Sequence, residues 1–144
     1  MPFIRIWVHL IWSTKNRQKL INSDIKPKLL DHLLVNAKEK SIWLANVNCV
    51  ADHVHLLISL GAKQSISKIA MLIKGKSSHW VNQNSLCKTK FEWQDEYIAV
   101  SVSESNLEKV KNYIQKQEEH HKQKSFAQEY DEFMKKYRSN YLSD

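Results

Sequence analysis

The chain has 144 residues, which suits one domain with a buried core and is too short for separate catalytic and DNA-binding domains. Its 22 Lys and Arg residues outnumber its 15 Asp and Glu residues, and the formal net charge of +7 favours a polyanionic partner such as nucleic acid. With only two glycines, the chain can form neither a Walker nucleotide-binding loop nor a dinucleotide-binding fingerprint, which argues against nucleotide hydrolysis and nicotinamide chemistry.

The first part of the chain predicts a strand, a helix and a hairpin. Residues 3–12 are rich in β-branched and aromatic side chains, which is typical of a strand. An apolar repeat at helical spacing over residues 24–40 predicts a helix, with Pro27 in the first turn, where proline is tolerated. Residues 42–50 and 53–60 then predict two strands joined by a tight turn.

The second part predicts a helix, a strand and another helix. Ser65 can cap a helix that reaches about residue 82. Residues 97–103 predict a further strand. Ser105 and Glu108 have the S-x-x-E spacing of a capping box, so we expect the next helix to begin at Ser105. An apolar stripe that would dock this helix consists of Leu107, Val110 and Ile114.

A repeat of aromatic residues beyond residue 125 predicts a last helix, laid onto the body of the protein or onto a partner subunit. The repeat consists of Phe126, Tyr130, Phe133 and Tyr137. Before this tail, the predicted order is β, α, β, β, α, β, α. That order matches an α+β ferredoxin-like sandwich, in which an antiparallel sheet carries its helices on one face.

Two histidines lie inside the second strand of the predicted hairpin. Because successive side chains of a strand point to opposite faces, His53 and His55 share one face and Val54 points to the other. Two adjacent imidazoles can form half of a divalent-metal site. Further along, Tyr113 and Gln117 are one helical turn apart and share a helix face. The plainer alternatives are an incidental histidine pair and a tyrosine that only packs.

This ordered set resembles the single-tyrosine transposases of the HUH endonuclease superfamily, which include transposases associated with repeated extragenic palindromes. The resemblance extends over nearly the whole chain and rests on residues 7–15, 51–57, 73–80, 91–97 and 113–121. The resemblance implies one HUH transposase domain over residues 1–144, with a ferredoxin-like fold and a homodimer in which the two sheets merge.

The resemblance also implies a chemistry. The protein would cleave and rejoin single-stranded DNA with hairpin ends, at the ends of an insertion sequence, through a 5′-phosphotyrosine intermediate. Tyr113 would be the nucleophile, and His53, His55 and Gln117 would hold a divalent ion. Nitrogen and oxygen ligands without cysteine suit Mg²⁺ or Mn²⁺ better than a structural zinc ion.

Neighbouring polar residues offer alternative assignments for two roles at this site. Glu118 or His120 could replace Gln117 as a ligand, since both lie close to it in the chain. Asp52 could orient one of the histidines, or it could simply form the turn that precedes them.

Basic and aromatic residues in two regions predict DNA contacts. One region lies on the predicted helix after the histidines, and the other lies near the ends of the first strand. Lysine and arginine would hold phosphates, and a tryptophan would stack on an unpaired base. The alternative is a solvated helix end with the tryptophan in the core. The predicted contacts are Lys74, Lys76 and Trp80 in the first region and Arg5, Lys15 and Arg17 in the second.

Three other functions remain open at this point. A domesticated, noncatalytic module would bind DNA hairpins without needing the tyrosine. A repeat-associated transposase would use the same chemistry on palindromic repeats. In an unrelated metal-dependent hydrolase, water would replace the tyrosine as nucleophile.

The sequence also predicts a compartment. Cys49 and Cys87 lack the spacing of a metal site and are expected to be reduced thiols. The N-terminus has no long uncharged apolar run, and no segment reaches the roughly 20 apolar residues of a membrane span. We therefore expect a soluble cytoplasmic protein.

Overall fold

The computed structural model describes residues 2–117, 119 and 125–142, with only the backbone for residues 126 and 136–142. The elements are β1 (Trp7–Ser13), η1 (Lys15–Arg17), α1 (Ile25–Glu39), β2 (Trp43–Val50), β3 (His53–Ser59), α2 (Ile66–Gln83), β4 (Ile98–Val102), η2 (Glu104–Asn106), α3 (Leu107–Gln115) and α5 (Phe126–Leu142). None of the described helices is both long and apolar enough to cross a membrane.

The described strands form one four-stranded sheet in the order β2-β3-β1-β4, and all three pairings are antiparallel. This confirms the predicted antiparallel α+β fold. The first strand begins later than predicted, at Trp7. The preceding residues extend beyond the sheet, where the Phe3 side chain is 87% exposed.

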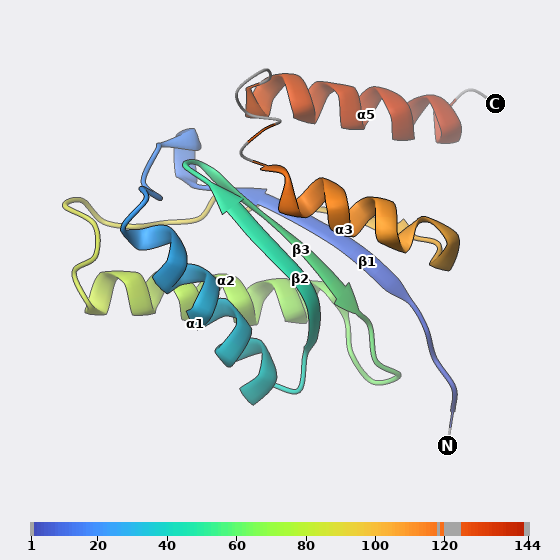
Figure 1. The fold of residues 1–144 in the computed structure, drawn as a ribbon, viewed down its shortest axis with the longest axis horizontal. Coiled ribbons are helices and arrows are strands. Elements are labelled where there is room, and N and C mark those ends of the chain that lie inside the picture. The colour runs from blue at the N-terminus through green and yellow to red at the C-terminus, as the bar shows by residue number, and fades with distance from the viewer. Residues whose placement is uncertain (1, 118, 120–124, 143–144) are drawn as a thin grey trace.

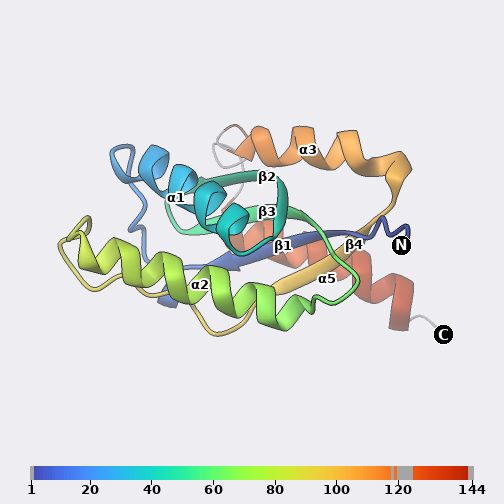
Figure 2. The same cartoon turned by 90° about the horizontal axis from the view of Figure 1, so that it is seen from below.

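The larger core lies between the sheet and helices α1 and α2. Figure 2 shows these two helices in front of the sheet and α5 behind it. Alternate residues of the two central strands point into this core, as the period of a strand requires. They are Val8, Leu10 and Trp12 of β1 and Val54, Leu56 and Ile58 of β3.

The prediction that the helices share one face of the sheet is wrong. Leu107 and Ile114 of α3 pack with Trp7 and Leu57, which point away from the larger core, and form a second, smaller core. Helical periodicity identifies the apolar side of a helix, but it does not tell which face of the sheet that side covers. Figure 1 shows α3 and α5 on the side of the sheet opposite α2.

The turn that precedes the histidines is held at the end of β1. Ala51 and Asp52 form the predicted turn between β2 and β3. The backbone N–H of Thr14 donates to the carbonyl oxygen of Asp52 at 2.8 Å, and that of Ile21 donates to the carbonyl oxygen of Ala51 at 2.9 Å. These bonds fix where the histidine strand starts.

Helix capping matches the prediction at one helix and differs at another. The Ser65 hydroxyl accepts a hydrogen bond from the backbone N–H of Lys68 at 3.3 Å, which confirms the predicted cap of α2. The capping box at Ser105 is wrong, because Ser105 lies in the short helix η2 and its hydroxyl contacts the Ser103 hydroxyl at 3.1 Å. Asn106 precedes α3 instead.

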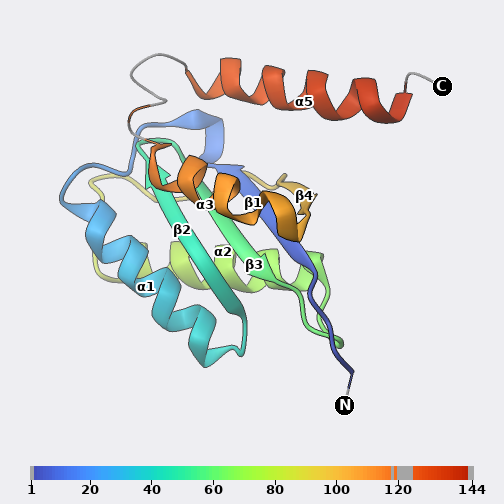
Figure 3. The same ribbon diagram turned by 45° about the vertical axis from the view of Figure 1, so that its right-hand side comes forward.

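The predicted tail helix is present as α5 and lies over the same face of the sheet as α3 (Figure 3). The Phe133 ring lies 5.8 Å from the His9 ring of β1, so the helix packs on the body of its own chain. The side chains of Phe126 and Tyr137, which the prediction also used, lie outside the described part of the structure.

Candidate metal and nucleophile site

The two histidines lie at the start of β3, a central strand, on the face that α3 and α5 cover. Both side chains are fully buried, and their ring centroids are 5.0 Å apart. Val54 between them points into the larger core, as the alternation of the strand requires. The fold therefore places two imidazoles side by side in an interior that excludes water.

Asp52 contacts the first of these histidines. A carboxylate oxygen of Asp52 lies 2.8 Å from Nδ1 of His53. Burial has the largest single effect and lowers the pKa of His53, but the hydrogen bonds and negative charges of Asp52 and Glu129 together outweigh it, so the net shift is upward. The contact at Nδ1 orients the ring and leaves Nε2 directed toward Glu129. Asp52 thus both forms the turn and holds His53.

His9 of β1 holds the second histidine. Nε2 of His9 lies 2.9 Å from Nδ1 of His55, and the rings are 5.1 Å apart. Burial lowers the pKa of His9 to about 4, which keeps this imidazole neutral near pH 7. Sequence reasoning gave His9 no role. Strand alternation places His9 and Trp7 on one face of β1, but only the pairing of β1 with β3 makes this the face of the histidine pair.

Helix α3 brings Tyr113 to the histidines. The Tyr113 ring centroid lies 5.7 Å from that of His55 and 6.2 Å from that of His9. The Tyr113 hydroxyl donates a hydrogen bond to Oε1 of Glu129. A buried pair of histidines and a half-buried tyrosine, about sixty residues apart in the sequence, thus meet in one group.

Glu129 of α5 is a second residue of the site that sequence reasoning missed. Its carboxylate oxygens lie 3.5 Å from Nε2 of His53 and 3.5 Å from Nε2 of His55. One ligand atom from each of these three residues lies within 4.8 Å of the others, so the group can hold a metal ion. The only sequence signal was a glutamate on a helix whose aromatic stripe faces inward.

Gln117 lies just beyond the end of α3 and is fully buried. Its Nε2 donates to the carbonyl oxygen of Tyr113 at 3.1 Å, so the two predicted site residues touch. Its Oε1 accepts no hydrogen bond from the residues that the structure describes. A buried amide oxygen in that state can serve as a ligand. The alternatives Glu118 and His120 lie outside the described residues.

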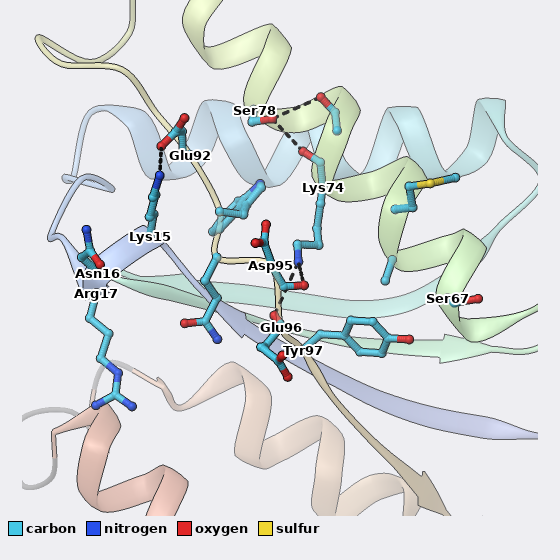
Figure 4. A pocket seen from close by; sticks show the side chains of 15 residues that line it. Lys15, Asn16, Arg17, Ser67, Lys74, Ser78, Glu92, Asp95, Glu96 and Tyr97 are labelled. Atoms are coloured by element: carbon cyan, nitrogen blue, oxygen red, sulfur yellow. Dashed lines mark hydrogen bonds and ion pairs between the residues drawn. The ribbon is translucent and has the colours of Figure 1, made fainter.

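Three of the predicted DNA contacts line one cleft. Lys15, Arg17 and Lys74 surround a cavity of about 990 Å³ between the end of β1, helix α2 and the segment 92–97 (Figure 4). Ser13, at this end of β1, pairs with His53 across the sheet. The cleft therefore adjoins the strand end that carries the histidines.

All three cations of the cleft contact other groups of the protein. Lys15 forms an ion pair with Glu92 at 3.2 Å. The Lys74 ammonium donates to the carbonyl oxygen of Asp95 at 2.9 Å, and its burial lowers its pKa. Arg17 extends toward α5 in Figure 4, where its guanidinium carbon lies 6.0 Å from the Tyr130 ring centroid.

The other three predicted contacts do not line this cleft. Lys76 is exposed on α2. Trp80 is half-buried and stacks on His32 of α1, with ring centroids 4.3 Å apart and planes 10° from parallel. Arg5 pairs with Glu104, which also accepts a hydrogen bond from the indole N–H of Trp7. The structure thus separates the predicted DNA contacts into one clustered set and three scattered residues.

Proteins of known family are similar in sequence to most of this chain. The chain is 28% identical over 114 residues to the ISDra2 transposase TnpA of Deinococcus radiodurans, which covers 76% of this chain and 81% of the relative. It is 27% identical over 119 residues to the transposase for insertion sequence element IS200 of Salmonella typhimurium, which covers 79% of this chain and 78% of the relative.

Two solved structures have a similar fold. A protein of Deinococcus radiodurans, solved as a candidate transposase, superposes with a TM-score of 0.66 and 25% identity over 81% of this chain and 93% of its own. A REP-associated tyrosine transposase bound to a REP hairpin superposes with a TM-score of 0.63 over 84% of this chain and 72% of its own, and its 15% identity bears on the fold alone.

The family model described as "Transposase IS200 like" matches residues 3–117, which include the histidine pair, Tyr113 and Gln117. With this match over most of its length, the chain belongs to the IS200-like transposases of the HUH superfamily.

Proposed function

We propose that this transposase cleaves and rejoins single-stranded DNA at the ends of an insertion sequence, with Tyr113 as the nucleophile and a divalent ion at His53 and His55. The observation that carries the proposal is the convergence of Tyr113, Gln117 and Glu129 on the buried histidine pair. A noncatalytic hairpin-binding module would need no tyrosine at this position.

The donor atoms fit a metal ion. His53, His55 and Glu129 present nitrogen and oxygen atoms to one point, and Gln117 adds a buried amide oxygen that receives no hydrogen bond from the described residues. Neutral imidazoles with oxygen ligands and no thiolate suit Mg²⁺ or Mn²⁺. When bound, such an ion would polarise the scissile phosphate and favour attack on phosphorus. Asp52 and His9 would orient the two imidazoles at their Nδ1 atoms.

Tyr113 would attack the phosphorus of a single-stranded phosphodiester. A bond forms between the phenolic oxygen and phosphorus, and the bond from phosphorus to the 3′ oxygen breaks. The departing oxygen takes a proton from water, which leaves a 5′-phosphotyrosine and a free 3′-hydroxyl. Glu129, whose Oε1 accepts the hydrogen bond from the Tyr113 hydroxyl, is placed to take the phenolic proton. The intermediate keeps the energy of the phosphodiester, so rejoining needs no nucleotide cofactor.

DNA would reach this site through the cleft at Lys15, Arg17 and Lys74. The cleft adjoins the start of β3, and its cations can hold phosphates while Tyr97 offers a ring for stacking. Arg5, Lys76 and Trp80 would contact more distant parts of the same DNA. The REP-associated tyrosine transposase of similar fold is bound to a REP hairpin. We propose that the DNA substrate of this chain likewise has hairpin ends.

The active protein would be a homodimer. Strands β2 and β4 form the two edges of the described sheet. An edge strand presents backbone N–H and C=O groups that a second copy can pair with, which would merge the two sheets.

A denaturing gel with labelled single-stranded oligonucleotides from the flanks of the gene tests the proposal. We expect a covalent adduct that requires Mg²⁺ or Mn²⁺, disappears with EDTA, and is lost in Tyr113→Phe, because phenylalanine has no nucleophilic oxygen. Tyr141→Phe is the matched control and should retain the adduct.

Other outcomes of this gel would contradict the proposal. Retarded DNA on a native gel without an adduct under any ion would favour a binding module. Cleavage that persists in Tyr113→Phe would mean that water is the nucleophile and that the protein is a hydrolase.

A further inference from the structure

We propose that Asn48 of β2 is a positioning residue that holds the end of the tyrosine helix against the histidine strand. This inference rests on the proposed function, in which Tyr113 reacts. Asn48 is buried, with 6% of its surface exposed, and its Nδ2 donates to the carbonyl oxygens of Ile114 at 2.9 Å and of Gln115 at 3.1 Å.

The end of α3 needs such a donor. The last four carbonyl groups of a helix have no partner within the helix. Helix α3 ends at Gln115, and Asn48 supplies both of its amide hydrogens to the last two carbonyls. The bonded carbonyls immediately follow Tyr113 and precede Gln117, so the clamp lies between the nucleophile and its neighbouring candidate ligand.

The orientation of the Asn48 amide is fixed by a third bond. Its Oδ1 accepts a hydrogen bond from the backbone N–H of Cys49 at 2.9 Å. A flipped amide would lose this bond and would point an oxygen at two carbonyl oxygens. The side chain therefore acts as a donor toward α3 in one orientation only.

The partner of Asn48 across the sheet is His55. These two residues face each other in the pairing of β2 with β3. Directly opposite side chains of an antiparallel pair lie on the same face, with Cβ atoms about 4.5–5.5 Å apart. One cross-strand pair thus joins a candidate metal ligand to the helix that carries Tyr113.

Asn46 adds a weaker contact of the same kind. Its Nδ2 donates to the carbonyl oxygen of Lys111 at 3.3 Å, and its Oδ1 accepts a hydrogen bond from the side chain of Gln115. Asparagine is disfavoured in strands, so two of them on one face of β2 need a specific partner. That partner is α3, which the two side chains hold at two successive turns.

Two substitutions of Asn48 separate a donor role from simple packing. Asn48→Ala removes the donors together with the side chain. Asn48→Asp keeps the size and the acceptor for Cys49 N–H, but it presents carboxylate oxygens to two carbonyls. If Asn48 acts as a donor, Asp is the more damaging replacement, whereas a packing role makes Asp the milder one. Asn22→Ala is the matched control, since Asn22 also bonds two backbone groups, at the start of α1.

The first experiment compares adduct formation with DNA binding in these variants. We expect Asn48→Ala to slow single-turnover formation of the tyrosine adduct by about tenfold or more, since small displacements of a nucleophile cost that much. Asn48→Asp should slow it further, while the Kd for the oligonucleotide changes by less than about twofold. Adduct formation as fast as in Asn22→Ala would overturn the proposal.

The second experiment does not depend on catalysis. Amide hydrogen exchange of peptides from residues 107–117 should become faster in both Asn48 variants and stay unchanged in Asn22→Ala, because the clamp restrains the last turn of α3. Unchanged exchange in the Asn48 variants overturns the clamp. If the wild-type protein forms no adduct, the proposed function is contradicted. The exchange experiment would still show whether Asn48 restrains the end of α3.

A milder variant covers the case in which both Asn48 variants fail to fold. Asn46→Ala removes the contacts to Lys111 and Gln115 and leaves Asn48 in place. It should speed the exchange over residues 107–117 by a smaller factor. If the Asn48 variants do not fold and Asn46→Ala leaves the exchange unchanged, the proposed positioning role of Asn48 is contradicted.

Discussion

At the scale of single residues, Glu129 adds a candidate metal ligand to the set that the sequence predicts. The sequence predicts Gln117 as the partner of the two histidines, and the structure brings Glu129 to them as well. A carboxylate adds a negative charge to a group of neutral donors, which strengthens attraction for a divalent cation. The affinity of the site for its ion should therefore depend strongly on a residue of the tail helix.

We expect Glu129→Gln to weaken Mn²⁺ binding by at least about tenfold, since even outer-shell changes at metal sites cost 10–100-fold. Isothermal titration calorimetry of the protein without DNA measures this directly. Glu39→Gln removes the same charge from the exposed end of α1 and is the control. Equal affinity in Glu129→Gln and Glu39→Gln would show that Glu129 is not a ligand.

At this scale, the sequence predicts the residues whose placement follows from local geometry and misses those brought together by tertiary contacts. The histidine pair could be predicted because strand alternation is local, and Tyr113 with Gln117 because helical spacing is local. Glu129 lies more than seventy residues after the histidines, and nothing local ties the two together. His9 cannot be identified from local spacing either, because its contact with His55 depends on the pairing of β1 with β3.

At the scale of elements, the sequence predicted where helices and strands lie better than it predicted how they pack. The hairpin at residues 51–52, the helix capped by Ser65 and the tail helix are all present. The side of the sheet that α3 covers was predicted wrongly, because an apolar stripe is compatible with either face. The face that α3 covers is the one that holds the histidines.

The two predicted helix caps allow a direct test of stability. Ser65→Ala should lower the free energy of unfolding by about 0.5–2 kcal/mol, because it removes a side chain that accepts a hydrogen bond at the start of α2. Ser105→Ala should cost less than about 0.5 kcal/mol, as is usual for an exposed residue without such a role. Urea denaturation measures both values. Equal losses in the two variants would contradict the capping described for α2.

At the scale of the whole molecule, we expect the net charge of +7 to act on DNA through the cleft that Lys15, Arg17 and Lys74 line. Each phosphate contact on single-stranded DNA contributes about 0.7 to the slope of log affinity against log salt. Arg17 lines the cleft and extends toward α5, the helix that carries Glu129, so we choose this cation of the cleft for the test.

Arg17→Gln should therefore reduce the salt dependence of oligonucleotide binding by about one contact, a slope change of roughly 0.7. Fluorescence anisotropy over a series of salt concentrations gives the slope. Lys28→Gln, on the exposed side of α1, removes the same charge far from the cleft and should leave the slope unchanged. A slope that responds equally to both variants would mean that only net charge matters.

The alternation of β1 and β3 has a consequence for engineering this protein. Leu10, Leu56 and Ile58 belong to the larger core, while His9 and His55 on the same strands point to the opposite face. Volume-conserving changes in a core usually cost less than about 1.5 kcal/mol. The larger core can thus be repacked for heat resistance on one face of the sheet, while the face that carries the histidines keeps every side chain it has.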